Sequence, residues 1–400
     1  MDQPLLIIGA GLAGWQAVRE FRKHDATTPI TLVTADAGDF YAKPTLSNAF
    51  GQKRGPAQLV TTPAATIAQT LNVTLLPYTR VTAIDAAAQV VQTTTAAQGV
   101  PASSGPLGYR DLVLATGAQP IRVPLAGAAD QVLSVNSLAD FGVFHQRLTA
   151  LGEGARVAIM GAGLIGCEFA NDLAGAGYAV AVVDPSDRPL AALLPPTASA
   201  QLQVALTGLS VQWHFGATVQ AVESAAQGLM LTLSNGQTIA ADIVLSAIGL
   251  RADTAMAQAA GIDCERGIVV NRQLQTSAPH VWALGDGAQY ASAASPGAPT
   301  GRTLPYVMPI MAAAKVLAAN LCGAEVALEF AAMPVAIKTP ALPIVAYPPA
   351  PGHLGEWVEQ ALGEWWFALA DAPGRAHGFV LTGTHTSKRM ALVKQMAAVV

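Results

Sequence analysis

Cysteine is scarce in this sequence of 400 residues. The three cysteines, Cys167, Cys264 and Cys322, lie far apart, and no two of them form a C-x-x-C pair. Such a number and spacing argue against a disulfide framework and against a zinc site, and they suit a reducing compartment. We therefore expect a cytoplasmic protein that binds no metal ion.

Charge is scarce as well. Charged residues make up only 12% of the chain, hydrophobic residues make up 52%, and the formal net charge is −4. A chain with this balance lacks the basic excess that nucleic acids or anionic membrane surfaces attract. We expect neither of them as a partner.

One long stretch of the chain contains no charged residue, as a membrane-spanning helix would. Residues 189–222 carry no formal charge and are long enough on paper to cross a bilayer. Pro195, Pro196 and Gly208 interrupt the stretch, and polar residues are spread through it, so a helix followed by a strand is predicted instead. The chain opens directly into an apolar strand, and we expect no signal peptide.

The most informative feature of the chain is a glycine fingerprint that occurs twice. Residues 9–14 (GAGLAG) follow the apolar run 4–8, and residues 161–166 (GAGLIG) follow the apolar run 156–160. Each G-x-G-x-x-G thus stands where a buried strand turns into a helix, with glycines for the turn, for close approach of a pyrophosphate and for helix packing. The helix N-terminus adds free N–H groups and partial positive charge. Two such sites predict two dinucleotides that exchange electrons.

Acidic residues after the next strand distinguish the two sites. Asp184 follows the second fingerprint at the spacing of an acid that binds the ribose 2′-hydroxyl. A 2′-phosphate about 4 Å away would cost roughly 4 kcal/mol at an effective dielectric of about 20, so NADH is preferred over NADPH. At the equivalent place in the first unit, Ala35 is followed by Asp36, and either the Asp36 side chain or the backbone is expected to hold the ribose.

The strand–helix–strand pattern after each fingerprint predicts an α/β fold with ligands at the carboxyl ends of parallel strands. Residues 242–249 resemble residues 111–117, and we expect them to carry the chain back to the first unit. The prediction is two doubly wound, Rossmann-like dinucleotide-binding domains, one inserted in the other, plus a small α+β C-terminal domain. The predicted limits are 1–118 with 242–325, then 119–241, then 326–400.

A third pattern, residues 276–286 (TSAPHVWALGD), resembles the T-x-x-x-x-h-h-A-h-G-D motif (h, hydrophobic) of FAD-dependent pyridine nucleotide oxidoreductases. Together with the fingerprints it makes the chain similar to the FAD-dependent pyridine nucleotide-disulfide oxidoreductase superfamily, and within it to the rubredoxin–NAD reductases. The resemblance spans nearly the whole chain and includes residues 41–47 (YAKPTLS), 110–118 (RDLVLATGA), 163–173 (GLIGCEFANDL), 306–309 (YVMP) and 338–340 (KTP). It implies that the first unit binds FAD and the second binds NADH.

The resemblance also implies the site residues. Lys43 and Glu168 are expected to be the catalytic pair beside the flavin and nicotinamide, and they are expected to contact each other because Asn48 stands where most relatives carry another lysine. The FAD site is then expected to include Gly9, Ala10, Gly11, Leu12, Ala13, Gly14, Ala35, Asp36, Lys43, Pro44, Val81, Thr116, Glu168, Asp286, Val307 and Lys338. The NAD site is expected to include Gly161, Gly163, Leu164, Ile165, Gly166 and Asp184.

What the chain lacks relative to disulfide reductases decides the predicted reaction. Those enzymes carry a redox-active cysteine pair in the segment that corresponds to residues 41–50, and this segment contains no cysteine here. Cys167, one residue past the second fingerprint, is expected to pack as a small buried hydrophobe. Electrons from NADH should therefore leave from the flavin itself.

The resemblance then implies an FAD-dependent NADH:rubredoxin oxidoreductase, which takes a hydride from NADH at flavin N5 and passes single electrons to rubredoxin, for instance in alkane degradation. An NADH-dependent reductase of a ferredoxin that serves an oxygenase is the alternative within the enzymes. A flavoprotein sensor that binds NADH without rapid turnover is the alternative outside them. With no disulfide to share between subunits, a monomer or weak dimer is expected.

Overall fold

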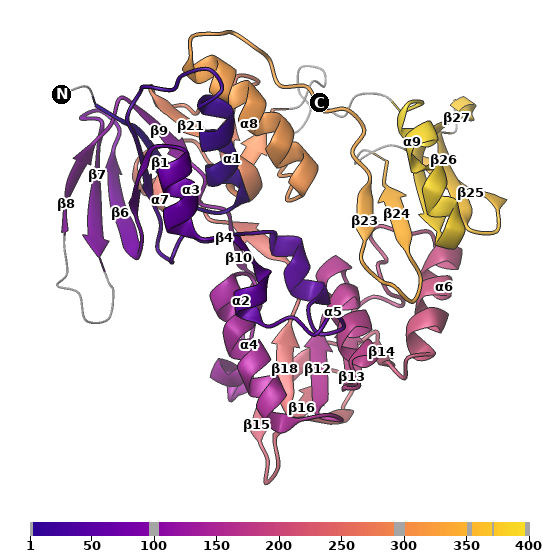
Figure 1. Cartoon of the computed structure of the whole chain (residues 1–400). Helices are drawn as coiled ribbons and strands as arrows, with labels where there is room; N and C mark the ends of the chain where they lie inside the picture. Colours follow the sequence, from indigo (N-terminus) through magenta and orange to yellow (C-terminus); the bar gives the residue numbers. More distant parts are fainter. Residues whose placement is uncertain (1–2, 96–103, 292–300, 350–353, 370–371, 397–400) are drawn as a thin grey trace.

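The computed structural model describes residues 3–95, 104–291, 301–349, 354–369 and 372–396 (Figure 1). The first fingerprint belongs to a five-stranded parallel sheet in the order β21-β9-β1-β2-β5. Helices α1 and α8 pack against each other and share one hydrophobic core with this sheet. Its elements are β1 (Leu5–Ile8), α1 (Leu12–Phe21), β2 (Ile30–Val33), β5 (Val73–Leu76), β9 (Asp111–Leu114), β21 (Val281–Ala283) and α8 (Val307–Leu321).

The second fingerprint belongs to a separate parallel sheet in the order β14-β13-β12-β18. Side chains alternate along β12, so that Val157 and Ile159 face a helical layer while Ala158 and Met160 face a second, mostly antiparallel sheet. The elements are α4 (Leu138–Leu151), β12 (Arg156–Met160), α5 (Leu164–Gly175), β13 (Ala179–Asp184), α6 (Pro196–Thr207), β14 (Gln212–Phe215) and β18 (Ile243–Ser246). The covering sheet consists of β11 (Ala126–Gly127), β15 (Val219–Ser224), β16 (Leu229–Leu233) and β17 (Thr238–Ala241).

The C-terminal part forms an antiparallel sheet in the order β23-β24-β27-β26-β25 (Figure 1, orange and yellow). One face of it, with Ile344 and Ala346, joins the core of the second parallel sheet, and α9 covers the other face through Leu392. The elements are β23 (Val335–Ile337), β24 (Ile344–Tyr347), β25 (Gly355–Ala361), β26 (Glu364–Leu369), β27 (Ala372–Thr382), η4 (Gly383–Lys388) and α9 (Arg389–Val393). The predicted fold class is confirmed: two parallel dinucleotide-binding sheets and a small α+β unit.

Shorter elements connect these layers. Strand β10 pairs with β19, and β6, β7 and β8 form an antiparallel sheet beside the first core. The bounds are β3 (Phe40–Tyr41), η1 (Lys43–Asn48), α2 (Pro56–Leu59), β4 (Val60–Thr62), α3 (Ala64–Thr70), β6 (Thr79–Asp85), β7 (Val90–Thr95), β8 (Ser104–Gly108), β10 (Ala118–Pro120), η2 (Ala129–Gln131), β19 (Leu250–Ala252), α7 (Ala255–Ala259), β20 (Ile268–Val270), η3 (Gly285–Gly287) and β22 (Ala288–Tyr290).

One strand lies in a different sheet from the one that its sequence predicts. Residues 242–249 are expected in the first unit, but β18 pairs in parallel with β12 of the second sheet, Ile243 opposite Val157. The likeness to residues 111–117 has a physical reason, because β9 and β18 occupy equivalent positions beside the strands that lead into the two fingerprints. The chain crosses back directly afterwards, where β19 pairs with β10. We therefore propose that the inserted domain ends after Ser246 rather than at residue 241, and the other domain limits stay a prediction.

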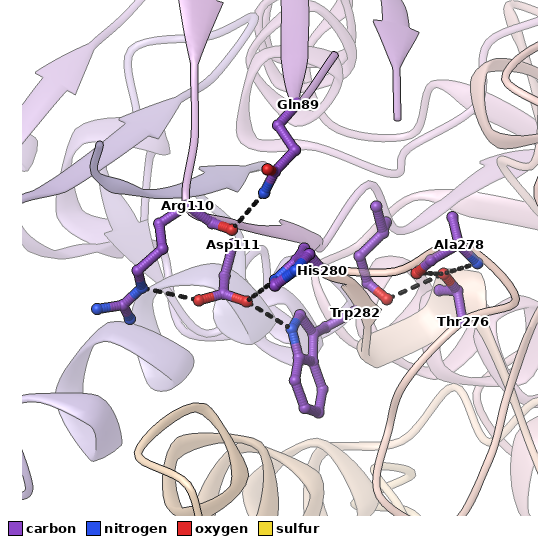
Figure 2. Close-up of polar contacts among 8 residues, drawn as sticks. Gln89, Arg110, Asp111, Thr276, Ala278, His280 and Trp282 are labelled. Carbon is purple, nitrogen blue, oxygen red and sulfur yellow. Dashed lines mark hydrogen bonds and ion pairs between the residues drawn. The ribbon is translucent and has the colours of Figure 1, made fainter. Parts of the chain in front are cut away.

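The starts of two of the motifs lie at the same edge of the first sheet (Figure 2). The carboxylate of Asp111 accepts a hydrogen bond from Arg110 Nε (2.9 Å) and is approached by Trp282 Nε1 and His280 Nδ1, both at 3.4 Å. Thr276 Oγ1 donates to the carbonyl of Val281 (2.9 Å), which holds the turn that leads into β21. The contacts of His280 and Trp282 with Asp111 join the starts of β9 and β21, which pair in parallel with Val281 opposite Leu112.

The stretch 189–222 folds as predicted, with helix α6 followed by strand β14. Within the residue ranges given above, no helix combines the length and the apolar character that a membrane crossing requires.

Candidate active site

A cavity of about 2090 Å³ runs between the two fingerprints. Its wall contains residues of the first fingerprint after β1, of the second fingerprint after β12, and of the start of α8. Sites for one drug-sized ligand have roughly 300–1,000 Å³. The volume and the two fingerprints in one wall fit two dinucleotides that meet in a single space.

The first two glycines of each fingerprint have the geometry that a phosphate cradle needs. Gly9 and Gly161 adopt φ angles of +108° and +105°, which favour glycine. A Cβ atom built on Gly11 or Gly163 would meet no protein atom within 4 Å. Both residues precede a helix whose N-terminus has no side-chain cap, so its N–H groups remain available to an anion.

The third glycine of each fingerprint allows close packing instead. A Cβ on Gly14 would lie 1.9 Å from the carbonyl oxygen of Gly9, and a Cβ on Gly166 would lie 1.9 Å from that of Gly161. Helix and strand approach so closely that only glycine fits. Gly14 and Gly166 do not line the cavity, whereas the other predicted site residues do.

The structure places these residues in one wall: Gly9, Ala10, Gly11, Leu12, Ala13, Ala35, Asp36, Lys43, Pro44, Val81, Thr116, Glu168, Asp286, Val307, Lys338, Gly161, Gly163, Leu164, Ile165 and Asp184. Their individual roles toward FAD and NADH stay predictions. Pro309 lies in the first turn of α8, and Val307, Met308 and Pro309 of this turn line the cavity.

The two acids expected at the riboses both accept hydrogen bonds from backbone N–H groups, and Asp36 also accepts one from a hydroxyl. Asp184 accepts hydrogen bonds from the N–H groups of Ala162 (2.6 Å) and Ser186 (2.7 Å). Asp36 accepts from Thr34 Oγ1 (2.6 Å) and from Gly38 N (3.0 Å). The carboxylate of Asp184 is thereby fixed at the end of β13 and that of Asp36 three residues after β2, both at the cavity wall.

The expected contact between Lys43 and Glu168 is wrong. Lys43 Nζ lies 4.0 Å from Asp286 Oδ2. Glu168 is fully buried and bonds Lys338 Nζ, Lys338 N (2.9 Å) and Ser47 Oγ (2.6 Å). The amine that compensates Glu168 thus comes from the C-terminal part of the chain.

Burial shifts the protonation of the Lys43–Asp286 pair. Desolvation lowers the pKa of Lys43, while Asp286 and Asp140 oppose that shift. Desolvation likewise raises the pKa of Asp286, while Lys43 opposes it. Each group therefore depends on the other to stay charged in the cavity wall.

No cysteine is among the described residues that line the cavity. Cys167 is fully buried, its Sγ donates to the carbonyl of Ala162 (3.2 Å), and burial raises the pKa of this thiol far above its usual range. It packs as the small hydrophobe that the sequence predicts. Within the described ranges, no group of three or more His, Cys, Asp or Glu side chains could hold a metal ion.

The sequence interpretation missed one polar residue in the cavity wall, Asn136, and two buried polar residues outside it, Asn171 and Asp172. Asn136 donates through Nδ2 to the carbonyl of Ala118 (2.8 Å), while its buried Oδ1 has no hydrogen-bond partner within the described part of the chain. An orphaned polar atom in the wall is what a bound cofactor would satisfy. Asn171 and Asp172 on α5 are buried and bond backbone of other segments. The signal in the sequence was the presence of three polar residues, Glu168, Asn171 and Asp172, in a helix that is otherwise apolar.

Comparisons with known proteins agree with this geometry. Residues 3–306 match the pyridine nucleotide-disulphide oxidoreductase family, and residues 327–396 match the rubredoxin binding C-terminal domain. The chain is 41% identical over 400 residues to a rubredoxin-NAD(+) reductase of Alcanivorax borkumensis, covering 99% of both chains. It is 38% identical over 400 residues to a nitric oxide reductase FlRd-NAD(+) reductase of Vibrio vulnificus, again covering 99% of both.

Among solved structures, the chain is similar to that of a covalent putidaredoxin reductase–putidaredoxin complex, with a TM-score of 0.84 and 25% identity over 98% of this chain and 94% of that chain. The protein belongs to the pyridine nucleotide-disulphide oxidoreductase family. Its C-terminal part is a rubredoxin-binding domain by the same kind of match, so the resemblance read from the motifs is confirmed.

Proposed function

We propose that the protein is an FAD-dependent oxidoreductase that oxidises NADH and passes electrons to rubredoxin. The observation that carries this proposal is one continuous cavity that joins two dinucleotide fingerprints and whose described wall contains no cysteine. Bound FAD takes up two electrons together and releases them singly. The match of residues 327–396 to a rubredoxin-binding domain supports the choice of acceptor.

In this proposal, the residues of the chain bind the two dinucleotides, orient them and balance their charge. Gly11 and Gly163 leave room for pyrophosphates at two helix N-termini. Asp184 rejects a 2′-phosphate by like charge, which favours NADH. The N-terminus of α8 and the Lys43 amine oppose negative charge that develops in the cavity, while the Lys338 amine compensates the buried Glu168 carboxylate. A monomer or weak dimer as the working form belongs to the same proposal, because the three cysteines are free and no disulfide has to be shared between subunits.

A second acceptor deserves a direct comparison. The similarity to the structure of a putidaredoxin reductase–putidaredoxin complex supports, as the second candidate, a ferredoxin-type acceptor that serves an oxygenase. Electron supply to alkane hydroxylation, a cytoplasmic location and the absence of nucleic acid or membrane as partners belong to the same proposal. A sensor that binds NADH without turnover would show slow flavin reduction.

A stopped-flow experiment tests the proposal. The holoenzyme is mixed with NADH or NADPH, and oxidised rubredoxin or ferredoxin is then added. We expect fast bleaching of the flavin by NADH, slower bleaching by NADPH, and fast reoxidation by rubredoxin. Fast reoxidation by ferredoxin alone would replace the acceptor, and slow reduction by both nucleotides would support the sensor.

A further inference from the structure

Helix α5 carries a row of buried polar side chains that the proposed function does not explain. Glu168, Asn171 and Asp172 are 0%, 6% and 7% exposed. Their spacing of three and four residues puts them on one face of the helix. Their neighbours Phe169, Ala170 and Leu173 are buried and apolar, so this row is the polar exception in a hydrophobic helix.

The row bonds the segment that follows Lys43. Asp172 accepts the backbone N–H groups of Phe50 (2.9 Å) and Gly51 (2.8 Å). Glu168 accepts from Ser47 Oγ, in the 3-10 helix η1 that starts at Lys43. The position of η1, and with it Lys43 at the cavity wall, is therefore set by α5.

The same row bonds the segment that carries Lys338. Asn171 Oδ1 accepts the N–H of Ala341 (3.0 Å), and Glu168 Oε1 accepts the N–H of Lys338 (2.9 Å). The short connection between β23 and β24 is thus held at its first residue, Lys338, and again at Ala341 by one helix. The N-terminus of that helix is the second fingerprint, which lines the cavity from the other side.

We propose that Asp172 and Asn171 are positioning residues, which clamp the two segments that present Lys43 and Lys338 to the cavity and tie them to the helix of the second fingerprint. Neither residue lines the cavity, so they act through the backbone that they hold. The inference rests on the proposed function for its kinetic consequence only. The clamp itself can be observed without turnover.

The clamp at Asp172 is sensitive to protons. Burial raises the pKa of Asp172 to about 6, and the N–H groups of Gly51 and Phe50 and the charge of Lys338 oppose this shift. The charged groups that face it are Lys338 and Glu168, and behind Phe50 lie His145 and Tyr178. Because the two N–H groups bond the carboxylate most strongly when it is ionised, protonation weakens both bonds.

This effect is local and differs in sign from the effect on global stability. A carboxyl group whose pKa is raised on folding favours the folded state when it is neutral, so its contribution to stability is present below the unfolded pKa and is lost as the pH rises through about 6. Loosening of the Phe50 and Gly51 bonds at low pH therefore does not report global unfolding.

Hydrogen exchange of the holoenzyme from about pH 5 to about pH 8 tests the clamp, with rates corrected for intrinsic exchange. We expect the protection of Phe50 and Gly51 to fall roughly tenfold below pH 6, as for the loss of charge-assisted hydrogen bonds. Asp172→Asn should remove this pH dependence and keep protection low throughout. The matched control is Asp242→Asn, which removes a carboxylate that accepts the N–H of Arg156 (2.8 Å) away from the cavity. This control should leave the protection of Phe50 and Gly51, and its pH dependence, unchanged. His145→Gln should leave the transition in place.

A kinetic readout tests the consequence. Asn171→Ala and Asp172→Asn should slow flavin reduction by NADH several-fold while leaving the NADH dissociation constant within about twofold. The control Asn320→Ala removes a buried amide that bonds the backbone of Gln273 and Val326. It should change neither the rate of flavin reduction nor the NADH dissociation constant. Unchanged protection at Phe50 and Gly51 in Asp172→Asn, or equal slowing in Asn320→Ala, would overturn the clamp. Failure of rubredoxin as acceptor would overturn the proposed function alone.

Discussion

At the scale of single residues, the fingerprint glycines show how one residue type serves different physical needs. Gly163 leaves open space for a ligand, and Gly166 lets α5 pack on the backbone of Gly161. Two glycines of the same motif therefore contribute differently: Gly163 affects ligand binding, and Gly166 affects the stability of the fold.

Two alanine variants separate these contributions. Gly163→Ala should keep the melting temperature of the wild type, because its φ of −75° suits alanine and its Cβ meets no protein atom within 4 Å, but it should raise the dissociation constant for NADH at least tenfold. Gly166→Ala should lower the free energy of unfolding by about 1–3 kcal/mol or more, since its Cβ overlaps a carbonyl oxygen. Thermal unfolding of the protein and NADH titration measure both. Equal melting temperatures for the two variants would contradict this assignment.

Residue contacts were predictable only where they are local. The glycines, Asp184 and the inert Cys167 follow from a few neighbouring residues and their strand and helix context. The partner of Glu168 does not, because Ser47 lies 121 positions and Lys338 lies 170 positions away in sequence. No periodicity encodes a contact between parts that approach only after all three units have packed.

At the scale of elements, helix α8 directs its N-terminus at the cavity. Met308, in the first turn, lines the cavity and is 57% exposed. An acid at such a position stabilises a helix by about 0.3–1 kcal/mol. The same charge would oppose negative charge on a reduced cofactor.

Met308→Glu should therefore retain stability while lowering the midpoint potential of the bound flavin by roughly 30 mV, equivalent to about 1.4 kcal/mol for a two-electron couple. Spectroscopic redox titration measures the shift. The matched control is Thr197→Glu in the first turn of α6, which does not line the cavity and should leave the potential unchanged. An unchanged potential in Met308→Glu would show that this helix end does not act on the flavin.

Elements were predicted well where hydrophobic pattern and turn signals agree. In the hairpin of β16 and β17, the turn contains Asn235 and Gly236, and Gly236 has a positive φ of +82° that favours glycine. Strand β18 was assigned to the wrong sheet, because a buried apolar strand has the same pattern in either of two parallel sheets. The order of strands depends on pairing, which the pattern of one strand does not contain.

At the scale of the whole molecule, two dinucleotide units and an antiparallel C-terminal sheet enclose one cavity, and each contributes to its wall. Such an arrangement brings a two-electron donor and a flavin together and leaves a separate domain for the acceptor. The account depends on electron transfer that uses no thiol. All three cysteines are free, and Cys167 is buried with a raised pKa.

The most direct test is stopped-flow reduction and reoxidation of a variant without cysteine, Cys167→Ala with Cys264→Ser and Cys322→Ser. Its flavin content is measured first. We predict that NADH reduces the flavin, and rubredoxin reoxidises it, at rates within about twofold of the wild type. A variant that holds its flavin but no longer delivers electrons to rubredoxin would contradict the account.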